Sequence, residues 1–209
     1  MHSWPPSNFM FSSRRGTARP LARRSRGSAS SAPERPRDGH WRGRLGSAAA
    51  TQQLGHAIGR SLRGGEALAL YGELGTGKTT LVRGLARGLD IPPQLVGSPS
   101  FVLIREYKGR FPLAHADLFR LESEEDVQRL GLSEYFDGRT VVAIEWADKG
   151  VSALPPDCLA VHLGHHSPST RTVTLTATGP QSRRLLRELR NTQRLQRLGK
   201  RPKKPQATR

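Results

Sequence analysis

Apolar side chains recur at helical spacing in two segments of the first half of the chain. The first segment begins near residue 47 and ends at two consecutive glycines, Gly64 and Gly65. Its apolar residues recur every three or four positions, which is typical of one face of an amphipathic helix. Residues 67–71 are continuously apolar and predict a strand, which the second helix follows. The positions that define the two helices are Thr51, Leu54, Ala57, Ile58 and Leu62, then Leu81, Leu85 and Leu89.

In the second half of the chain, β-rich runs alternate with polar turns. Residues 98–107 and 111–121 flank a short turn that contains Gly109, and together they predict a β-hairpin. Residues 140–146 form a continuous apolar run, as in a central strand that is buried on both faces. An acidic helix, a further short helix and two closing strands are expected at residues 122–130, 131–136, 158–163 and 171–177, respectively. The pattern predicts an α/β domain with a mixed β-sheet flanked by helices.

The two ends of the chain differ from the middle in composition. The chain has 209 residues and a formal net charge of +17, and residues 1–44 carry ten arginines against two acids. Residues 181–209 carry eleven basic residues against Glu188, so the middle of the chain is nearly neutral. We expect a disordered Arg/Ser/Pro-rich leader at residues 1–45, a globular domain at 46–180 and a basic, partly helical tail at 181–209. Leucines in the tail predict an amphipathic helix over residues 183–198.

Because the excess charge belongs to the ends, it does not indicate a nucleic-acid-binding domain. Basic arms can contact RNA phosphates without reading sequence, so nonspecific RNA contact and a merely solvated tail both stay open. The first 44 residues also have the composition of an organelle transit peptide, with a disordered leader or a start codon assigned too early as the alternatives. No apolar stretch approaches the ~18 residues of a membrane span. Together with a single cysteine, Cys158, this leads us to expect a cytoplasmic protein without membrane contact.

A glycine-rich motif lies between the predicted strand at residues 67–71 and the second helix. It consists of Gly72, Glu73, Leu74, Gly75, Thr76, Gly77, Lys78 and Thr79, which fits the P-loop pattern G-x-x-x-x-G-K-[ST]. Glycines let successive N–H groups turn towards phosphate, and the helix points its positive N-terminus at the same place. Lys78 should reach the β- and γ-phosphates, and the Thr79 hydroxyl should bind Mg²⁺. The strand and helix around the motif favour a P-loop NTPase-like domain over a chance glycine-rich turn.

Phosphoryl chemistry on a P-loop also needs a carboxylate for the metal and a group that orients the nucleophile. Glu145 follows four apolar residues, where the acid of a Walker B strand belongs. Asp117 follows a similar run, and His115 shares a strand face with it because the two are two positions apart. Either acid could be an ordinary surface carboxylate, and His115 could be a satisfied core histidine. We assign no role to the histidines that lack partners at metal-ligand spacing, namely His56, His162, His165 and His166.

Four motifs together, in this order and spacing, resemble the bacterial TsaE (YjeE) family. They are the P-loop with Thr80, the Ser-Pro-Ser-Phe segment at residues 98–101, residues 115–121, and Ile-Glu-Trp at residues 144–146. The resemblance covers about residues 47–177 and leaves out both basic ends. It implies the ATPase partner in making threonylcarbamoyladenosine on tRNA, which works with the TsaD and TsaB proteins. Hydrolysis in that family is thought to reset the complex, with no phosphate transferred to tRNA.

The resemblance also implies roles for single residues. Asp117 and Lys78 would act in ATP hydrolysis, and Thr79 and Glu145 would be Mg²⁺ ligands. Residues 98–101 would form a mobile segment near the γ-phosphate. The residues expected to contact the nucleotide are Glu73, Leu74, Gly75, Thr76, Gly77, Lys78, Thr79, Thr80, Trp146, Lys149 and Arg171. The chain departs from the family pattern at Ala116 and Ser100, where Phe and Thr are usual, which puts local rigidity in doubt more than catalysis.

The sequence therefore predicts a weak, Mg²⁺-dependent ATPase that acts with TsaD and TsaB and meets tRNA indirectly through that complex. The product would be the threonylcarbamoyl group on N6 of adenosine 37, in tRNAs that read codons starting with adenine. A small-metabolite P-loop kinase is the alternative, although the middle of the chain has only scattered arginines and no evident lid insertion. A non-catalytic RNA-binding or scaffold protein that depends on its basic ends is a third hypothesis.

Overall fold

Seven strands form a mixed sheet in the computed structural model, which describes residues 39–191 and 195. In sheet order they are β1 (His40–Leu45), β7 (Arg171–Ala177), β6 (Cys158–His165), β2 (Ala67–Tyr71), β5 (Val141–Glu145), β4 (Leu113–Asp117) and β3 (Ile104–Tyr107). The four central strands β6, β2, β5 and β4 are parallel to one another. The outer strands β1, β7 and β3 pair antiparallel with their neighbours. The predicted α/β fold with a mixed sheet is confirmed.

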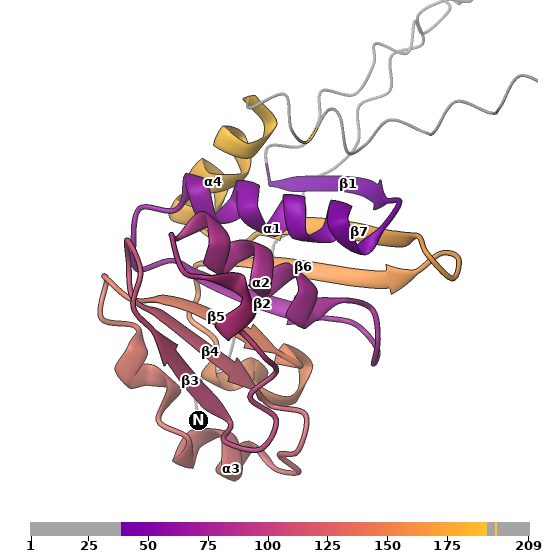
Figure 1. Ribbon diagram of the computed structural model, residues 1–209. Helices are drawn as coiled ribbons and strands as arrows, with labels where there is room; N and C mark the ends of the chain where they lie inside the picture. The colour runs from indigo at the N-terminus through magenta and orange to yellow at the C-terminus, as the bar shows by residue number, and fades with distance from the viewer. Residues whose placement is uncertain (1–38, 192–194, 196–209) are drawn as a thin grey trace, which may run out of the picture. The chain divides into compact units, whose positions relative to one another are not determined.

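Helices pack on both faces of this sheet (Figure 1). On one face lie α1 (Ala48–Ser61), α2 (Lys78–Gly88) and α4 (Pro180–Asn191). On the other lie α3 (Glu124–Arg129) and the 3-10 helices η2 (Leu132–Tyr135) and η3 (Ala147–Ala153), while η1 (Pro93–Leu95) follows α2. None of the helices in the described ranges has the length and apolar character needed to cross a bilayer.

The helical faces read from the sequence are the buried ones. Leu54 and Ile58 of α1 and Leu81 and Leu85 of α2 have no exposed surface and belong to one core with β2, β6 and β7. Removing one such leucine from water contributes about 1.5–3 kcal/mol. The core therefore fixes α2, and with it the P-loop, against the strand that precedes the motif.

One strand lies where the sequence predicted a disordered leader. β1 pairs with β7 from His40 to Leu45, so the predicted leader at residues 1–45 is wrong at its last six positions. Leu45 is fully buried and Trp41 packs on the same core, which offsets the entropy of ordering this segment. Residues 1–38 lie outside the described residues, and the disorder predicted for them stays a prediction.

The C-terminal helix belongs to the domain. α4 runs from Pro180 to Asn191. It begins slightly before the helix predicted at residues 183–198 and covers the first part of it. Its leucines join the core beside α1, so the division predicted at residue 180 does not separate an independent tail. Asp157 caps the helix, since its carboxylate accepts the amides of Gln181 at 2.7 Å and Ser182 at 3.0 Å. Apart from Leu195, the predicted continuation lies outside the described residues.

Candidate functional site

Three strands bring the predicted site residues to one edge of the sheet. The P-loop follows β2, Asp117 ends β4, and Glu145 ends β5, all of which are parallel. Asp117 pairs directly with Glu145 in the register of β4 and β5. The carboxyl ends of parallel strands are where α/β proteins bind ligands. A cleft of roughly 430 Å³ lies there, lined by Leu74, Gly75, Gly77, Lys78, Thr79, Thr80, Ser98, Ser100, Phe101, Asp117, Phe119, Arg120, Glu145 and Trp146.

Glycines shape the turn between β2 and α2. Gly72, Gly75 and Gly77 have φ angles of 135°, 75° and 102°, in a region that side chains disfavour. Gly77 is the N-cap of α2 and supplies no side-chain acceptor to its first turn. The amides that open the helix are therefore available to phosphate oxygens. The Thr76 hydroxyl donates to the Glu73 carbonyl at 2.8 Å, which fastens the loop to itself.

Lys78 is a buried cation at the start of α2, with 5% of its surface exposed. Its ammonium donates to the carbonyls of Gly72 at 2.5 Å and Glu73 at 3.1 Å, and it lies 3.7 Å from the centre of the Trp146 ring. Burial lowers the pKa of Lys78 below its ordinary value of 10.5, against the attraction of three carboxylates, those of Glu145, Asp117 and Asp148. The P-loop carbonyls thus hold the cation in the turn where the motif predicts phosphate.

One oxygen of Glu145 connects α2 with β4. The Thr79 hydroxyl donates to Oε1 of Glu145 at 2.8 Å, and Nε2 of His115 lies 2.9 Å from the same atom. Because an ionised carboxylate only accepts, Nε2 of His115 carries the proton. His115 has no exposed surface, and its Nδ1 has no partner among the residues that the structure describes. His115 is therefore a core histidine that also orients a site carboxylate.

The Thr79 hydroxyl and the Glu145 carboxylate are oxygen ligands of the kind that Mg²⁺ prefers. Their oxygens are 2.8 Å apart. Two adjacent ligands of an octahedral ion that binds at 2.0–2.1 Å are separated by about 3 Å, so the pair fits such an ion. Within residues 39–191 and 195, no group of three His, Cys, Asp or Glu side chains is placed to hold a metal. An ion at Thr79 and Glu145 would need further ligands from water or phosphate.

Asp117 ties residues 98–101 to the end of β4. Its Oδ2 accepts from the hydroxyls of Ser98 at 2.5 Å and Ser100 at 2.8 Å, and its Oδ1 accepts the Phe119 amide at 3.0 Å. Asp117 is 2% exposed, so these donors replace the water that a carboxylate would otherwise require. The segment expected to be mobile is thus fastened at two hydroxyls. Ser100 supplies one of them, so serine in place of the usual threonine keeps the group that this contact uses.

Aromatic side chains line the cleft beside the ammonium of Lys78. Trp146 directly follows β5 with a φ of 57°, a left-handed conformation that is rare for a bulky residue. The Phe119 ring packs on Trp146 with 4.9 Å between centroids, and the Arg120 guanidinium lies 4.4 Å from the centre of the Phe101 ring. Phe119 and Arg120 follow Asp117 within the third motif, but their residue types alone indicated no role.

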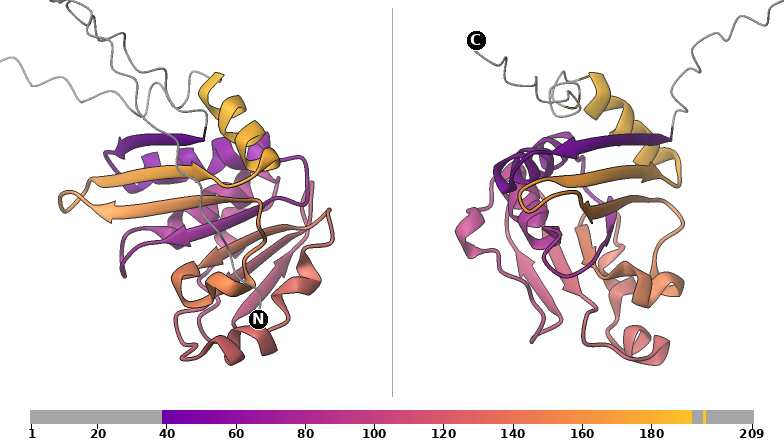
Figure 2. Two further views of the ribbon diagram at one scale, coloured as in Figure 1. Left: turned by 180° about the vertical axis from the view of Figure 1, so that it is seen from behind. Right: turned by 90° about the vertical axis from the view of Figure 1, so that its right-hand side faces the viewer.

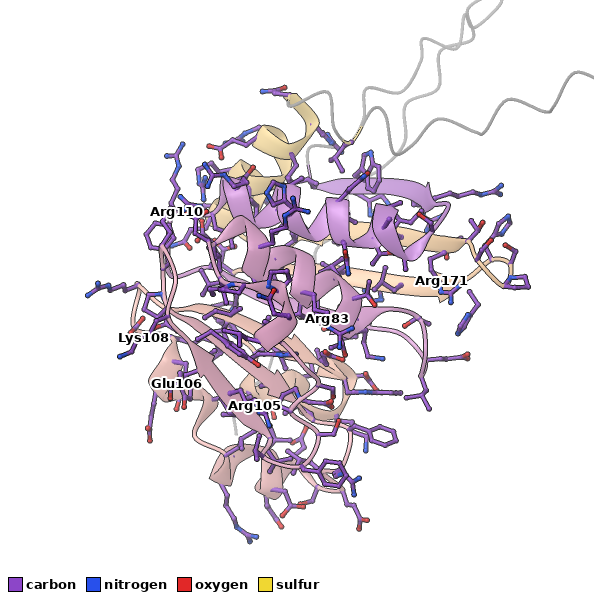
Figure 3. All side chains as sticks on the ribbon, in the orientation of Figure 1. Arg83, Arg105, Glu106, Lys108, Arg110 and Arg171 are labelled. Atoms are coloured by element: carbon purple, nitrogen blue, oxygen red, sulfur yellow. The ribbon has the colours of Figure 1, made fainter. Side chains whose placement is uncertain are left out.

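Four residues predicted to contact nucleotide are not among those that line the cleft, namely Glu73, Thr76, Lys149 and Arg171. The Lys149 ammonium donates to the carbonyls of Phe119 at 2.6 Å and Leu121 at 2.9 Å. Arg171, at the start of β7 (Figure 3), donates to the Gly75 carbonyl at 3.2 Å and to carbonyls of the turn between β6 and β7. Both cations brace backbone segments around the cleft, since carbonyl oxygens already accept their hydrogen bonds.

Residues 45–173 match the family model described as "Threonylcarbamoyl adenosine biosynthesis protein TsaE". The chain belongs to the TsaE family. The matched range of this TsaE-family chain contains every residue that lines the cleft and leaves out both basic ends. The resemblance drawn from the four motifs is thereby confirmed.

Individual relatives support the same assignment. The tRNA threonylcarbamoyladenosine biosynthesis protein TsaE of Bacillus subtilis (strain 168) is 41% identical over 126 residues, which cover 60% of this chain and 78% of that protein. The protein of the same name from Treponema pallidum (strain Nichols) is 38% identical over 129 residues, which cover 62% of this chain and 95% of that protein. The crystal structure of Bacillus subtilis YdiB matches with a TM-score of 0.62 and 31% identity, over 73% of this TsaE-family chain and 95% of YdiB.

Proposed function

We propose that this chain is a slow, Mg²⁺-dependent ATPase that serves the formation of threonylcarbamoyladenosine on tRNA. Its curated relatives carry the name of that biosynthesis. The observation that carries the proposal is the convergence of Thr79, Glu145 and Asp117 on one cleft beside the P-loop. A P-loop, a hydroxyl-and-carboxylate pair suited to Mg²⁺ and a further carboxylate are the groups that ATP hydrolysis requires.

In this proposal, the P-loop amides and Lys78 hold the phosphates of ATP. The Lys78 ammonium exchanges the carbonyls of Gly72 and Glu73 for phosphate oxygens, so it keeps hydrogen-bond acceptors throughout. Thr79 and Glu145 hold Mg²⁺, which when bound neutralises charge that develops on the phosphate oxygens. His115 keeps the Glu145 carboxylate in place through Nε2.

We assign to Asp117 the orientation of the attacking water. A group in that role must be held rigidly, because small displacements of a reacting group lower the rate strongly. Three donors fix the Asp117 carboxylate, two of them from the segment at residues 98–101. The same contacts place that segment at the cleft, where Ser98, Ser100 and Phe101 contribute to the lining.

The cleft also offers a place for the proposed TsaD and TsaB partners. Leu74, Phe101 and Phe119 line it and are 75%, 85% and 42% exposed. Exposed apolar side chains that gather beside a polar site are typical of protein interaction surfaces. A partner that covers them would exclude water from the phosphates, which strengthens every electrostatic interaction there. We therefore expect slow turnover alone and faster turnover in the complex.

The test is ATP hydrolysis by the full chain with Mg²⁺, alone and with the TsaB and TsaD proteins from the same source. We expect the partners to raise turnover by at least about tenfold, a change of about 1.4 kcal/mol in the activation barrier. Lys78→Ala is the matched control and should abolish turnover under both conditions. Turnover that ignores both partners and appears only with a sugar, nucleoside or other small acceptor would instead support the metabolite kinase.

A further inference from the structure

A second polar surface lies on strands β1, β7 and β6. The left panel of Figure 2 shows these strands in front of α1, which covers their opposite face. The helices α3, η2 and η3 pack with β2, β4 and β5, and no described helix covers β1 or β7 on this side. We name this surface the outer face. Its side chains are His40, Arg42 and Arg44 of β1, Thr172, Thr174 and Thr176 of β7, and His162 of β6.

The strand register aligns four side chains in one row, which crosses the outer face from β1 to β6 and ends on the neighbouring strand β2. Arg42 is opposite Thr174, Thr174 is opposite His162, and His162 is opposite Tyr71. Directly opposed residues of neighbouring strands share a face of the sheet. With strands about 4.8 Å apart, the row spans about 14 Å from a cation to an aromatic ring.

The β1 end of this row is cationic. A groove of roughly 430 Å³ is lined there by Arg42, Gly43, Arg44, Thr172, Val173 and Thr174. Neither Arg42 nor Arg44 forms an ion pair with any residue that the structure describes. Strands β1, β6 and β7 contain no Asp or Glu. The groove thus has positive charge with no internal counterion, next to hydroxyls that can donate to an anion.

The other end of the row offers a stacking surface. The rings of His162 and Tyr71 are parallel to within 9°, with 4.4 Å between their centroids. Since that separation is close to the spacing of neighbouring strands, the rings stack along the direction that crosses the sheet. The second face of the exposed His162 ring is therefore turned towards β7, above Thr174. His162 is exposed and pairs in register with Thr174, which lines the groove.

The basic ends of the chain join the domain beside the same strand. An Arg190 guanidinium nitrogen of α4 donates to the His40 carbonyl at the start of β1. Residues 1–38 carry eight arginines and residues 192–209 carry seven lysines and arginines, and both segments are attached next to this contact. The continuous described range thus begins and ends near the start of β1.

We infer that the outer face binds single-stranded RNA, with phosphates at Arg42 and Arg44 and a base stacked on His162. A basic groove beside aromatic rings is the combination by which proteins hold single strands. A double-stranded nucleic acid is a less suitable ligand, because its bases are already stacked on one another and only its backbone charge remains available to the protein. The groove shares no lining residue with the nucleotide cleft, so this site is independent of the proposed ATPase.

The test measures binding of a fluorescent single-stranded RNA of about 16 nucleotides to the full chain without ATP, over a series of salt concentrations. We expect Arg42→Gln with Arg44→Gln to weaken binding about tenfold and to reduce the log–log salt slope by about 1.4, the value for two lost phosphate contacts. The matched control removes the same charge at the opposite edge strand, with Arg105→Gln and Lys108→Gln (Figure 3). Equal losses in both double variants would assign binding to the basic ends alone and overturn the site.

His162→Ala tests the stacking contact separately and leaves the charge of both arginines in place. We expect it to weaken RNA binding about tenfold and to leave binding of inorganic polyphosphate unchanged, because only RNA has bases to stack. Unaltered RNA binding would overturn the assignment of His162, and a DNA duplex bound as tightly as the RNA would overturn the assignment to single strands. Because Arg42, Arg44 and His162 are exposed, thermal unfolding of each variant should match the unaltered chain.

Discussion

Lys78 is held in a position that phosphate binding requires and that folding alone disfavours. An ammonium loses its water when it is buried, and the loss is only partly offset by hydrogen bonds. Here two P-loop carbonyls accept hydrogen bonds from the ammonium and the Trp146 ring makes a cation–π contact with it. Burial nevertheless lowers the pKa of Lys78. A lowered pKa means that the folded chain binds this proton less tightly than the unfolded chain does.

Lys78→Met should therefore change how stability depends on pH. In the unaltered chain, the penalty for charged Lys78 is present at neutral pH and disappears as pH rises from its lowered pKa to the ordinary 10.5. We expect the free energy of unfolding of the unaltered chain to rise relative to Lys78→Met over this window. Urea unfolding of both proteins at pH 7.5 and near pH 10 measures the difference, in which the other titrating groups cancel. A difference that stays constant or falls with pH would contradict the buried charge.

The sequence predicts the positions of residues that a motif fixes, but it does not predict hydrogen-bond partners that come from tertiary packing. Thr79, Glu145 and Asp117 line one cleft because a P-loop and two strand ends fix their positions, and their roles stay predictions. Lys149 donates to carbonyls of a distant loop, and Arg171 donates to the distant Gly75 carbonyl as well as to carbonyls of the turn before it. Which carbonyl such a side chain reaches depends on how those loops pack, and spacing along the chain carries no record of it.

The two helices α1 and α2 approach each other through glycines. Gly55 and Gly59 of α1 face Leu81 and Leu85 of α2, and a β-carbon at either glycine would lie within 2.3 Å of a backbone oxygen. Gly84 of α2 faces α1 in the same way. This close contact sets the position of the helix that carries Lys78 and Thr79, so it links packing to the geometry of the cleft.

Gly84→Ala should test that link. The new methyl group would lie 2.1 Å from the Gln52 carbonyl oxygen, which forces the helices apart. Overpacking of this kind costs about 1–3 kcal/mol, against about 1 kcal/mol gained from helix propensity. We expect a lower unfolding midpoint in thermal denaturation and weaker ATP binding. Gly97→Ala is the control, because a β-carbon there has no atom within 4 Å, and a midpoint unchanged in both variants would contradict close helix packing.

Element prediction succeeded where the apolar pattern was strong and failed at β1. The fully buried strand β5 was read directly from a continuous apolar run. In β1, a histidine and two arginines alternate with Trp41, Gly43 and Leu45, so only two large apolar residues mark the buried side. The strand is ordered by pairing with β7, more than a hundred residues later, which no local pattern reveals. Residues 98–103 do not form the strand that the sequence predicted. The reason is local, because the Val102 amide donates to the Pro99 carbonyl and the chain turns there.

At the scale of the whole molecule, the described chain carries two polar sites of different character. The nucleotide cleft combines one buried cation with carboxylates from two parallel strands, whereas the outer face combines uncompensated arginines with stacked rings. The near-neutral middle of the sequence contains the cleft, whereas Arg42 and Arg44 of the outer face belong to the basic first 44 residues. Total charge alone would have pointed to RNA and missed the cleft.

The most direct measurement is Mg²⁺-dependent ATP hydrolysis by the full chain with Glu145→Gln. Glutamine keeps the size of the side chain and removes the charge that would hold Mg²⁺, so we expect turnover to fall at least about a hundredfold, or about 2.7 kcal/mol in the barrier. Glu106→Gln makes the same change on β3, where Tyr135 is the one side chain in the described part of the protein that donates to the carboxylate, and turnover should stay within about twofold of the unaltered chain. Full Mg²⁺-dependent turnover in Glu145→Gln would contradict the proposed site.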